Sequence, residues 1–312
     1  MNILSFDIFV AGGGAAGMAA ALAASGQGAS VLLAEREPVL GGILNRCIHH
    51  GFGLGYFKED MTGTEYAERF REKIVASDVT VMTDTTILSI TKDRQALLSG
   101  PTGMTKVCFD HCILATGSYE RTLESIPVAG TRPSGIFSAG CAQGLINEGG
   151  YDIGDRIVIL GSGNVGQIMA RQLKTSGKTI LAMLEQNDRP GGIARNIREC
   201  IEACNIPLSL QTTVTEIHGA DRITGVSIRD LKTGQDSFLP CDTLITALGL
   251  IPDRILAEGL IPKAHSITQN NSVHTALPEW IHLCGNCDSI HDFVDTVSAQ
   301  GEQIGKEVTY VS

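Results

Sequence analysis

The sequence carries one dinucleotide-binding pattern twice, in residues 7–43 and again in residues 156–193. Each copy has an apolar strand, a Gly-x-Gly-x-x-Gly turn that opens a helix, and a second strand that ends in a glutamate. The glycines of the two copies lie 149 positions apart: Gly12, Gly14 and Gly17 in the first, and Gly161, Gly163 and Gly166 in the second. Two nucleotides are therefore expected, and a chain with two such pockets most economically passes electrons between them.

Each glycine of the turn has a physical reason for its position. The first permits a sharp change of direction from strand to helix, the second lets backbone approach a pyrophosphate, and the third lets helix pack on strand. No obvious capping side chain follows the turns, which continue with Ala15 and Ala16 in one copy and with Asn164 and Val165 in the other. The first N–H groups of both helices are thus left for phosphates, at the positive end of the helix dipole.

An acidic residue ends the second strand of each copy. Glu35 lies 18 residues beyond the third glycine, Glu185 lies 19 residues beyond its own, and both are followed by a Gly-Gly-Ile segment. A carboxylate at this point can accept hydrogen bonds from both ribose hydroxyls. Two complete patterns, each in strand, turn and helix context, indicate nucleotide binding far more strongly than a single glycine triplet does.

Composition sets limits on what else the chain does. Its 312 residues allow about two domains, and 36 glycines with 43% hydrophobic residues fit an α/β enzyme whose apolar strands have helices on both sheet faces. A net charge of −10 argues against a nucleic-acid partner. We expect a soluble, cytoplasmic protein with no membrane span, because no basic leader precedes the first strand and no apolar run is long enough. The nine cysteines are expected to be mostly free thiols.

The order of segments predicts an α/β fold of two Rossmann-like, three-layer ββα/βαβ nucleotide-binding domains, the second inserted in the first. Strands at 112–117 and 244–249 close the two repeats, and a short strand at 280–283 precedes a helix that begins near Asp295. This tail is too short for a third domain and should return to the first sheet. We therefore expect one domain at 1–117 and 250–312 and the other at 118–249. Residues 121–150 are interpreted as a linker and an entry strand.

These motifs resemble the two-dinucleotide-binding-domain flavoproteins, the group of pyridine nucleotide-disulfide oxidoreductases. The resemblance rests on GGGAAG with Glu35, ATG at 115–117, GSGNVG with Glu185, ALG at 247–249 and CGN at 284–286. Length and threading are similar to low-molecular-weight thioredoxin reductases over essentially the whole chain. Residues 40–70 and 150–173 look more like a narrower group, which includes flavoproteins associated with glycerol-3-phosphate dehydrogenase and the α-subunits of opine oxidase, amino-acid dehydrogenase and hydrogen cyanide synthase.

The resemblance implies FAD in the first domain and NAD, or NADP, in the second. The FAD contacts that it implies are Gly12, Gly14, Ala15, Ala16, Gly17, Glu35, Arg36, Gly42, Asn45, Ala115, Thr116, Gly117, Gly285, Asn286, Thr296 and Val297. Those to the nicotinamide nucleotide are Gly161, Gly163, Asn164, Val165, Gly166, Glu185 and Gly249. The N-terminus of the last helix should point at the flavin and stabilise negative charge on its reduced form.

The cysteine pattern departs from that of the disulfide reductases. Thioredoxin reductases have a CxxC just before the second glycine motif, where this chain has only Cys141, and the segment after the first Gly-Gly offers only Cys47. Thiol–disulfide exchange by the usual route is therefore not expected. Cys284 and Cys287 do form a CxxC. It could be a redox pair or, with His282 and His291, a zinc site, but the favoured interpretation is buried packing beside the flavin, with no metal.

Candidate catalytic residues come from position alone: Cys47, His49, His50, Cys141 and His291. The histidines either order loops or handle protons, and a reactive thiol at Cys47 or Cys141 stays open. We expect an FAD-dependent oxidoreductase that transfers hydride from NADH to FAD and then to an unidentified acceptor that is not a dithiol. Glu185 favours NADH because it would repel a 2′-phosphate, and the nearest downstream arginines are Arg189 and Arg195.

Two alternatives to this function remain. The chain could be the FAD- and NAD-binding subunit of a heteromeric amine, amino-acid or glycerol-phosphate dehydrogenase, or a nucleotide-binding subunit without turnover. A partner dehydrogenase subunit or a homodimer is compatible with either, and the sequence does not name the acceptor or donor of electrons.

Overall fold

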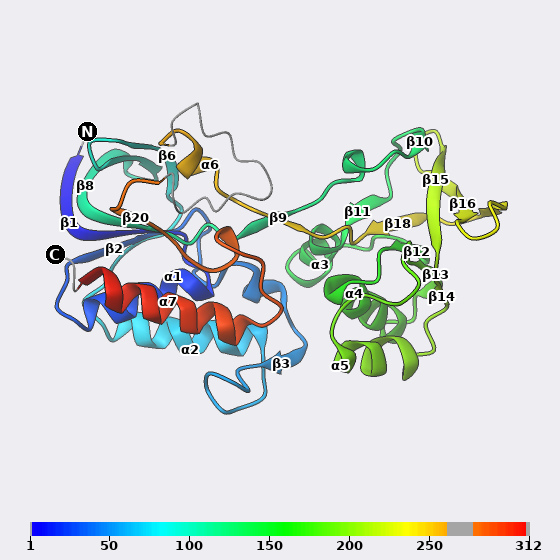
Figure 1. The fold of residues 1–312 in the computed structure, drawn as a ribbon, viewed down its shortest axis with the longest axis horizontal. Helices are drawn as coiled ribbons and strands as arrows, with labels where there is room; N and C mark the ends of the chain where they lie inside the picture. Colours follow the sequence, from blue (N-terminus) through cyan, green and yellow to red (C-terminus); the bar gives the residue numbers. More distant parts are fainter. Residues whose placement is uncertain (1, 261–276, 310–312) are drawn as a thin grey trace. The chain divides into compact units, whose positions relative to one another are not determined.

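The computed structural model describes residues 2–260 and 277–309, which divide into two compact units (Figure 1). Unit 1 is Met1–Tyr119 with Ile251–Ser312, and unit 2 is Glu120–Leu250. The sequence predicted that the chain passes from one domain to the other after residues 117 and 249. Within the described ranges, no helix combines the length and the apolar character needed to cross a membrane.

Unit 1 is built on a seven-stranded sheet in the order β5-β2-β1-β8-β7-β6, with β20 also paired to β8. Its strands are β1 (Asn2–Ala11), β2 (Val31–Ala34), β5 (Thr80–Met82), β6 (Thr86–Thr91), β7 (Gln95–Gly100), β8 (Gly103–Leu114) and β20 (Ile281–Leu283). The pairs β1–β2, β1–β8, β2–β5 and β8–β20 are parallel, whereas β6–β7 and β7–β8 are antiparallel. The prediction that the C-terminal segment returns to the first sheet is therefore confirmed.

Three helices cover one face of this sheet, α1 (Ala15–Ser25), α2 (Gly63–Val75) and α7 (Val294–Thr309). The alanine-rich helix α1 is almost wholly buried. Helix α7 can pack closely on it because Gly301 and Gly305 have no side chains, and a Cβ on either would lie 2.3 Å from an α1 carbonyl oxygen. Helix α2 begins with a capping box between Thr62 and Glu65, which fixes where it starts.

The second face of the sheet is covered mainly by residues of β-strands, whereas the sequence predicted helices there. Phe9 and Ala11 point to that face and pack with Leu98 of β7, with Ile90 of β6 and with the short helix α6 (Ile255–Glu258). An apolar strand shows that both its faces are buried, but it does not show whether a helix or a β-hairpin covers them.

Unit 2 repeats this architecture around a five-stranded parallel sheet in the order β11-β18-β12-β13-β14. These strands are β11 (Ile136–Ser138), β12 (Arg156–Leu160), β13 (Thr179–Leu184), β14 (Leu208–Ser209) and β18 (Thr243–Thr246). One face packs on the helices α3 (Ala139–Asn147), α4 (Asn164–Thr175) and the π-helical turn η3 (Ile197–Glu202). The other packs on a second sheet of β10 (Ala129–Gly130), β15 (Thr212–Gly219), β16 (Ile223–Asp230) and β17 (Asp236–Leu239).

The segment 121–150 contains the predicted entry strand, but its interpretation as a linker was wrong. It supplies strand β11 to the parallel sheet and folds into α3, whose Ala139 and Ala142 lie in the core of unit 2. Pro127 and Pro133 precede these elements without interrupting them. Short glycine-rich segments of this kind have little apolar periodicity, so their helical state depends on the sheet against which they pack.

The predicted closing strands end earlier than the sequence suggested. Strand β8 ends at Leu114 and β18 at Thr246, so 115–117 and 247–249 are loops at the carboxyl edge of each sheet. The remaining elements are short: η1 (Gly42–Arg46), β3 (His50–Phe52), β4 (Met61–Thr62), β9 (Ser118–Glu120), η2 (Leu123–Ser125), α5 (Ala194–Asn196), β19 (Leu250–Pro252) and η5 (Gly285–Cys287).

A pair of histidines joins β8 to β20 in unit 1. His111 Nδ1 lies 3.2 Å from His282 Nε2, and the two ring centroids are 5.4 Å apart. Burial and the neighbouring His111 lower the pKa of His282 to about 4, although Glu307 acts in the opposite direction. Burial, with a smaller effect of Arg94, also lowers the pKa of His111. Both rings are therefore neutral at pH 7.

We predict that this pair makes unit 1 less stable as the pH falls from about 6.5 to about 4. Above that window neither the folded nor the unfolded state protonates His282, whereas within it only the unfolded state does. Lowering the pH from 7.5 to 5 should cost the parent about 1 to 2 kcal/mol more than a His282→Gln variant. Urea unfolding at both pH values measures the difference, and equal losses in both proteins would contradict the prediction.

Candidate nucleotide-binding sites

The first glycine turn is closed by backbone contacts that leave no room for side chains. Gly12 has φ +105°, and a Cβ there would lie 2.5 Å from the carbonyl oxygen of Ala115. A Cβ on Gly17 would lie 1.8 Å from the oxygen of Gly12. Gly14 differs, because no heavy atom of the described residues lies within 4 Å of the position its Cβ would take. The space beside Gly14 is therefore open to a ligand.

Helix α1 starts directly at this space. Gly14 is its N-cap residue, no side chain in the described part of the chain caps it, and Ala15 and Ala16 follow. The loop after β2 lies against the same turn, since Gly41 N donates to Gly13 O at 2.8 Å. Uncapped N–H groups at the end of a helix form a site for a pyrophosphate.

Glu35 stands at the end of β2 beside the turn and is 7% exposed. Its Oε2 accepts a hydrogen bond from Gly13 N at 2.6 Å, and its Oε1 accepts one from Glu37 N at 2.9 Å. Arg36 is turned away, with 74% of its side chain exposed beside Glu37. The carboxylate is thus fixed at the place where a ribose would bind.

The returning C-terminal segment reaches the start of α1. Cys284 N donates to Leu114 O at 2.9 Å, and a Cβ on Gly285 would lie 2.8 Å from the Cβ of Ala16. The next residue, Asn286, accepts a hydrogen bond from His291 N. Gly285 is therefore adjacent to the start of α1, and Ala115, Thr116 and Gly117 lie in the loop after β8.

The first turn of α7 is hydrogen-bonded to the loop between β3 and β4. The carboxylate of Asp295 accepts hydrogen bonds from Gly53 N at 3.1 Å and Gly55 N at 2.7 Å, and so holds the loop before β4. Val297 lies close to Gly285, because a Cβ on Gly285 would be 3.2 Å from Val297 Cγ1. Thr296 precedes it in the same turn of the helix. No sequence pattern indicated that Asp295 would serve this loop.

Asn45 is occupied by protein partners. Its Nδ2 donates to Leu40 O at 3.3 Å, and its Oδ1 accepts from Arg71 Nη1 at 3.0 Å. Gly42, three residues earlier, begins η1. A contact between Asn45 and a cofactor would therefore share the amide with Arg71, a residue that the sequence analysis did not identify.

Cys47 and the two histidines lie beyond η1. The thiol of Cys47 is buried and donates to Ile43 O, and burial raises its pKa to about 12, so it is not a ready nucleophile. His49 packs on Phe52 at a centroid distance of 5.0 Å. His50 faces a separate pocket.

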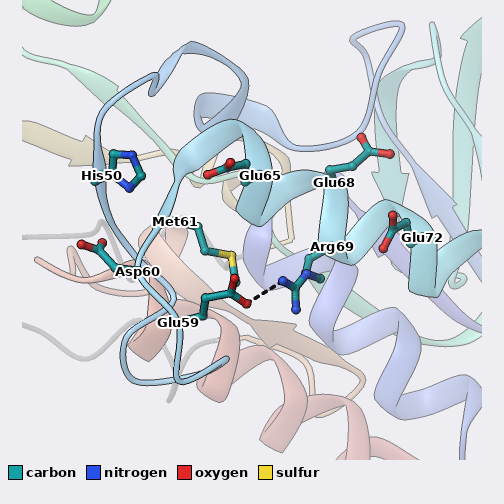
Figure 2. Close-up of a pocket in the computed structure, with 8 residues that line it drawn as sticks. All are labelled: His50, Glu59, Asp60, Met61, Glu65, Glu68, Arg69 and Glu72. Carbon is teal, nitrogen blue, oxygen red and sulfur yellow. Dashed lines mark hydrogen bonds and ion pairs between the residues drawn. The ribbon is translucent and has the colours of Figure 1, made fainter.

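Figure 2 shows that pocket, which has a volume of about 270 Å³. Five of its lining side chains are acidic and Arg69 is paired with one of them, Glu59, at 2.6 Å. The lining residues are His50, Glu59, Asp60, Met61, Glu65, Glu68, Arg69 and Glu72. This excess of negative charge does not suit a nucleotide, and none of these residues belongs to a glycine turn.

The second glycine turn has the same backbone geometry as the first. Gly161 has φ +102°, and a Cβ there would lie 2.2 Å from the oxygen of Ala247. Gly163 is the N-cap of α4, and the described residues contribute neither a capping side chain nor any heavy atom within 4 Å of its Cβ position. Gly166 packs on Gly161 and Ala247, and Asn164 and Val165 open the helix.

Glu185 is held more tightly than Glu35. Its Oε2 accepts from Ser162 N at 3.1 Å and Ser162 Oγ at 2.5 Å, and its Oε1 accepts from Asn187 N at 3.0 Å and Asn187 Nδ2 at 2.7 Å. Burial acts to raise the pKa of Glu185, but these hydrogen bonds outweigh it and keep the pKa below its usual range. The residue is therefore a firmly ionised acceptor.

Side chains tie the loop 191–196 to α4. The amide Nε2 of Gln167, which is fully buried, donates to Ser162 O at 2.6 Å and Gly191 O at 2.7 Å. Asn164 Oδ1 accepts from Ile193 N at 2.8 Å and from the side chain of Asn196 at 3.0 Å. This network was not predicted from the sequence, although the repeat contains a signal for it. Gly13, Ala15 and Met18 of the first copy are replaced in the second copy, 149 positions later, by the polar residues Ser162, Asn164 and Gln167.

The arginines that follow Glu185 are not arranged around it. Arg195 pairs with Glu199 at 2.9 Å, and Arg189 is exposed. In the loop after β18, which also contains Ala247, Gly249 has φ +100° and accepts a hydrogen bond from Arg121 N.

The nine cysteines are all free thiols. Cys284 and Cys287 are fully buried, Cys287 Sγ donates to Leu114 O at 2.8 Å, and burial raises the pKa of both thiols. His282 is paired with His111, while His291 lies 3.4 Å from Ser289 Oγ and 3.3 Å from Gln300 Oε1. In residues 2–260 and 277–309, no three His, Cys, Asp or Glu side chains form a metal-binding group.

Cys141 is exposed in the first turn of α3, beside a carboxylate. Glu120 accepts from Ser138 Oγ at 2.5 Å, from Gly140 N at 2.7 Å and from Cys141 N at 3.3 Å. Two backbone donors at the start of α3, Gly140 N and Cys141 N, are thus bound to a carboxylate of the protein itself.

Comparisons with known proteins agree with this geometry. The sequence profile of the pyridine nucleotide-disulphide oxidoreductases matches residues 6–301. The opine oxidase A subunit from Agrobacterium tumefaciens (strain Ach5) is 26% identical over 284 residues, which is 81% of this chain and 54% of that protein. Thioredoxin reductase from Treponema pallidum (strain Nichols) is 24% identical over 259 residues, 83% of this chain and 80% of that protein. The chain thus spans about half the length of the opine oxidase protein.

The fold is that of a solved thioredoxin reductase. The crystal structure of the enzyme from T. acidophilum superposes with a TM-score of 0.78 and 20% sequence identity, covering 99% of each chain.

We predict that alanine at Gly14 or Gly163 separates folding from nucleotide binding. Both backbones have extended conformations that alanine adopts readily, and both Cβ positions are open, so the free energy of unfolding should change by less than about 1 kcal/mol. The methyl group would instead meet the pyrophosphate and weaken binding by roughly 10- to 100-fold. Thermal unfolding and calorimetric titration with FAD and NADH test this, and each variant is the control for the other unit. Unaltered binding in both would contradict it.

Proposed function

We propose that this chain, which belongs to the pyridine nucleotide-disulphide oxidoreductase family, is an FAD/NAD(P)-dependent oxidoreductase that oxidises NADH without a dithiol. FAD binds to unit 1 and NADH to unit 2, with NADPH the weaker substrate. The electrons leave the reduced flavin for an acceptor other than a protein disulfide.

The contact of Gly285 with the start of α1 supports FAD in unit 1 and is the observation that carries the assignment. It brings the C-terminal segment to the first turn of α1, and among the described residues only the first glycine turn has such a neighbour. Glu35 would hold the ribose, and the uncapped N–H groups of α1 would hold the phosphates. The start of α7, a 16-residue helix, would place its positive end near the flavin ring.

The chemistry that the flavin supplies when bound is acceptance of a hydride from the nicotinamide ring. Such a transfer between stacked rings needs orientation and little acid–base help, so the chain has to bind, orient and exclude water. The backbone donors of the two glycine turns and the two glutamates beside them suit that task.

The thiol geometry supports an acceptor that is not a dithiol. Cys47, Cys284 and Cys287 are buried, and burial raises the pKa of each. Cys141 is exposed but single, and its helix N-terminus is occupied by Glu120. A thiolate near a helix N-terminus is stabilised by backbone donors, and here Gly140 N and Cys141 N already donate to Glu120.

Glu185 supports the preference for NADH. A buried and ionised carboxylate at the ribose position accepts hydroxyl donors and repels a 2′-phosphate. Arg195, which could have neutralised that repulsion, is paired with Glu199.

A second function is favoured by the similarity to the opine oxidase protein. On that alternative the chain is the FAD- and NAD-binding subunit of a heteromeric dehydrogenase for an amine, an amino acid or glycerol phosphate. Co-purification of a second polypeptide that reduces the flavin with its own substrate would support it. Failure of NADH to reduce the flavin would favour this alternative or a subunit without turnover.

Stopped-flow reduction of the purified flavoprotein by NADH and NADPH tests the main proposal. Flavin bleaching should be faster with NADH, and the cofactor released on denaturation should be FAD. Release of FMN, or no bound flavin after reconstitution, would contradict the assignment of unit 1.

We predict that Glu185→Ala weakens NADH use and relaxes the preference against NADPH. The substitution removes an acceptor for ribose and a repeller of phosphate together. Loss of one charged hydrogen bond corresponds to about 1.5–3 kcal/mol, or roughly 10- to 100-fold in kcat/KM. An unchanged ratio of kcat/KM for NADH and NADPH would be inconsistent with this role.

We also predict that thiol substitutions leave flavin reduction nearly intact. Cys141→Ser, and the double change Cys284→Ser with Cys287→Ser, should keep NADH-to-flavin transfer within about threefold of the parent, because less than about 1 kcal/mol of the barrier depends on them. Thioredoxin should be a poor acceptor. Efficient NADH-dependent reduction of a protein disulfide that either change abolishes would overturn the prediction.

A further inference from the structure

The two ribose-binding acids differ in how many donors hold them. In the first copy only backbone groups do so, with Gly13 N bound to Oε2 of Glu35 and Glu37 N to Oε1. The side chain of Glu37 points to Arg36, at 3.7 Å.

In the second copy the same two backbone donors are present and two side chains are added. Ser162 and Asn187 stand at the positions of Gly13 and Glu37, and each gives Glu185 its N–H and also a side-chain donor. The added donors are the Ser162 hydroxyl at 2.5 Å and the Asn187 amide at 2.7 Å.

An ionised carboxylate has about four lone-pair sites. Two of those on Glu35 have no partner among residues 2–260 and 277–309, so a ribose can use them directly. All four on Glu185 are already filled by protein donors. A ribose can therefore reach Glu185 only by displacing one of them.

The amide of Asn187 is the donor that can leave. Ser162 is fully buried, and its hydroxyl also accepts a hydrogen bond from Gly191 N at 2.8 Å, so it is fixed from two sides. Asn187 is exposed, and its side chain can turn into water without opening the fold.

We propose that the Asn187 carboxamide occupies the ribose subsite of unit 2 and competes with the nucleotide for Oε1 of Glu185. This inference rests on the proposed function, because it takes an adenine dinucleotide as the ligand of unit 2. Binding exchanges the amide for a ribose hydroxyl, so part of the interaction free energy replaces a hydrogen bond that already existed. Asn187 is thus a specificity-determining residue that weakens the binding of unphosphorylated nucleotide.

Asn187→Ala tests the competition. Removing the amide should raise the affinity of the flavin-loaded protein for NADH and for adenosine diphosphate ribose by about three- to tenfold. The affinity for NADPH should rise less. Its 2′-phosphate donates no hydrogen bond to Glu185, and without the Asn187 amide the negative charge of that carboxylate repels the phosphate more strongly. The ratio of NADH to NADPH affinity therefore rises. Gln186→Ala, at the exposed neighbouring amide, is the matched control and should change neither affinity.

The reciprocal change tests the same idea in unit 1. Glu37→Asn places a carboxamide beside Glu35 and should weaken FAD binding about three- to tenfold on reconstitution, whereas Glu37→Ala removes the same charge and should not.

The outcomes separate this inference from the proposed function. If NADH reduces the parent's flavin but binds Asn187→Ala equally or less tightly, Asn187 positions the carboxylate and the inference is overturned while the function stands. If the parent binds no NADH, the proposed function fails. The FAD affinity of Glu37→Asn then decides, and an affinity equal to that of Glu37→Ala would overturn the inference.

Discussion

Both units depend on a close approach of backbone segments at the glycine turn. A side chain on Gly17 would collide with the carbonyl of Gly12, and one on Gly161 would collide with that of Ala247. With no side chains between them, the helix start lies directly at the carboxyl edge of the sheet. The uncapped N–H groups of α1 and α4 then face open space, and each neighbouring strand ends in a glutamate that is held against the turn. The binding chemistry follows from this packing.

The two copies keep the backbone interactions and differ in their side chains. Both acids accept from the turn and from the residue two positions on, whereas the polar groups of Ser162, Asn164 and Gln167 have no counterpart in the first copy. Unit 1 instead recruits a distant segment, because β20 and Gly285 return to its turn. A common frame thus supports two different pockets, one completed by the C-terminus and the other by its own polar network.

The features that sequence predicted were those with a fixed spacing. Glycine triplets, terminal acids and apolar strands are local patterns, so both repeats and the return of residues 281–283 to the first sheet were accessible. The cover of the second sheet faces was not, since burial of Phe9 does not say what buries it. Helix α3 was missed because its glycines and alanines form a helix only against a sheet. Contacts such as Asp295 with Gly53 and Asn45 with Arg71 join residues far apart in the sequence, and no local pattern encodes them.

The position of Glu120 explains why the loss of a dithiol need not disturb the rest of the protein. The N-terminus of α3 presents backbone donors that favour an anion, whether that anion is a thiolate or a carboxylate. Here a carboxylate accepts from Gly140 and from Cys141, so the helix start is satisfied without any sulfur chemistry. A helix end that donates to a carboxylate does not need a thiolate at this position. The two glycine turns are built from separate backbone contacts, so their geometry does not depend on how the start of α3 is satisfied.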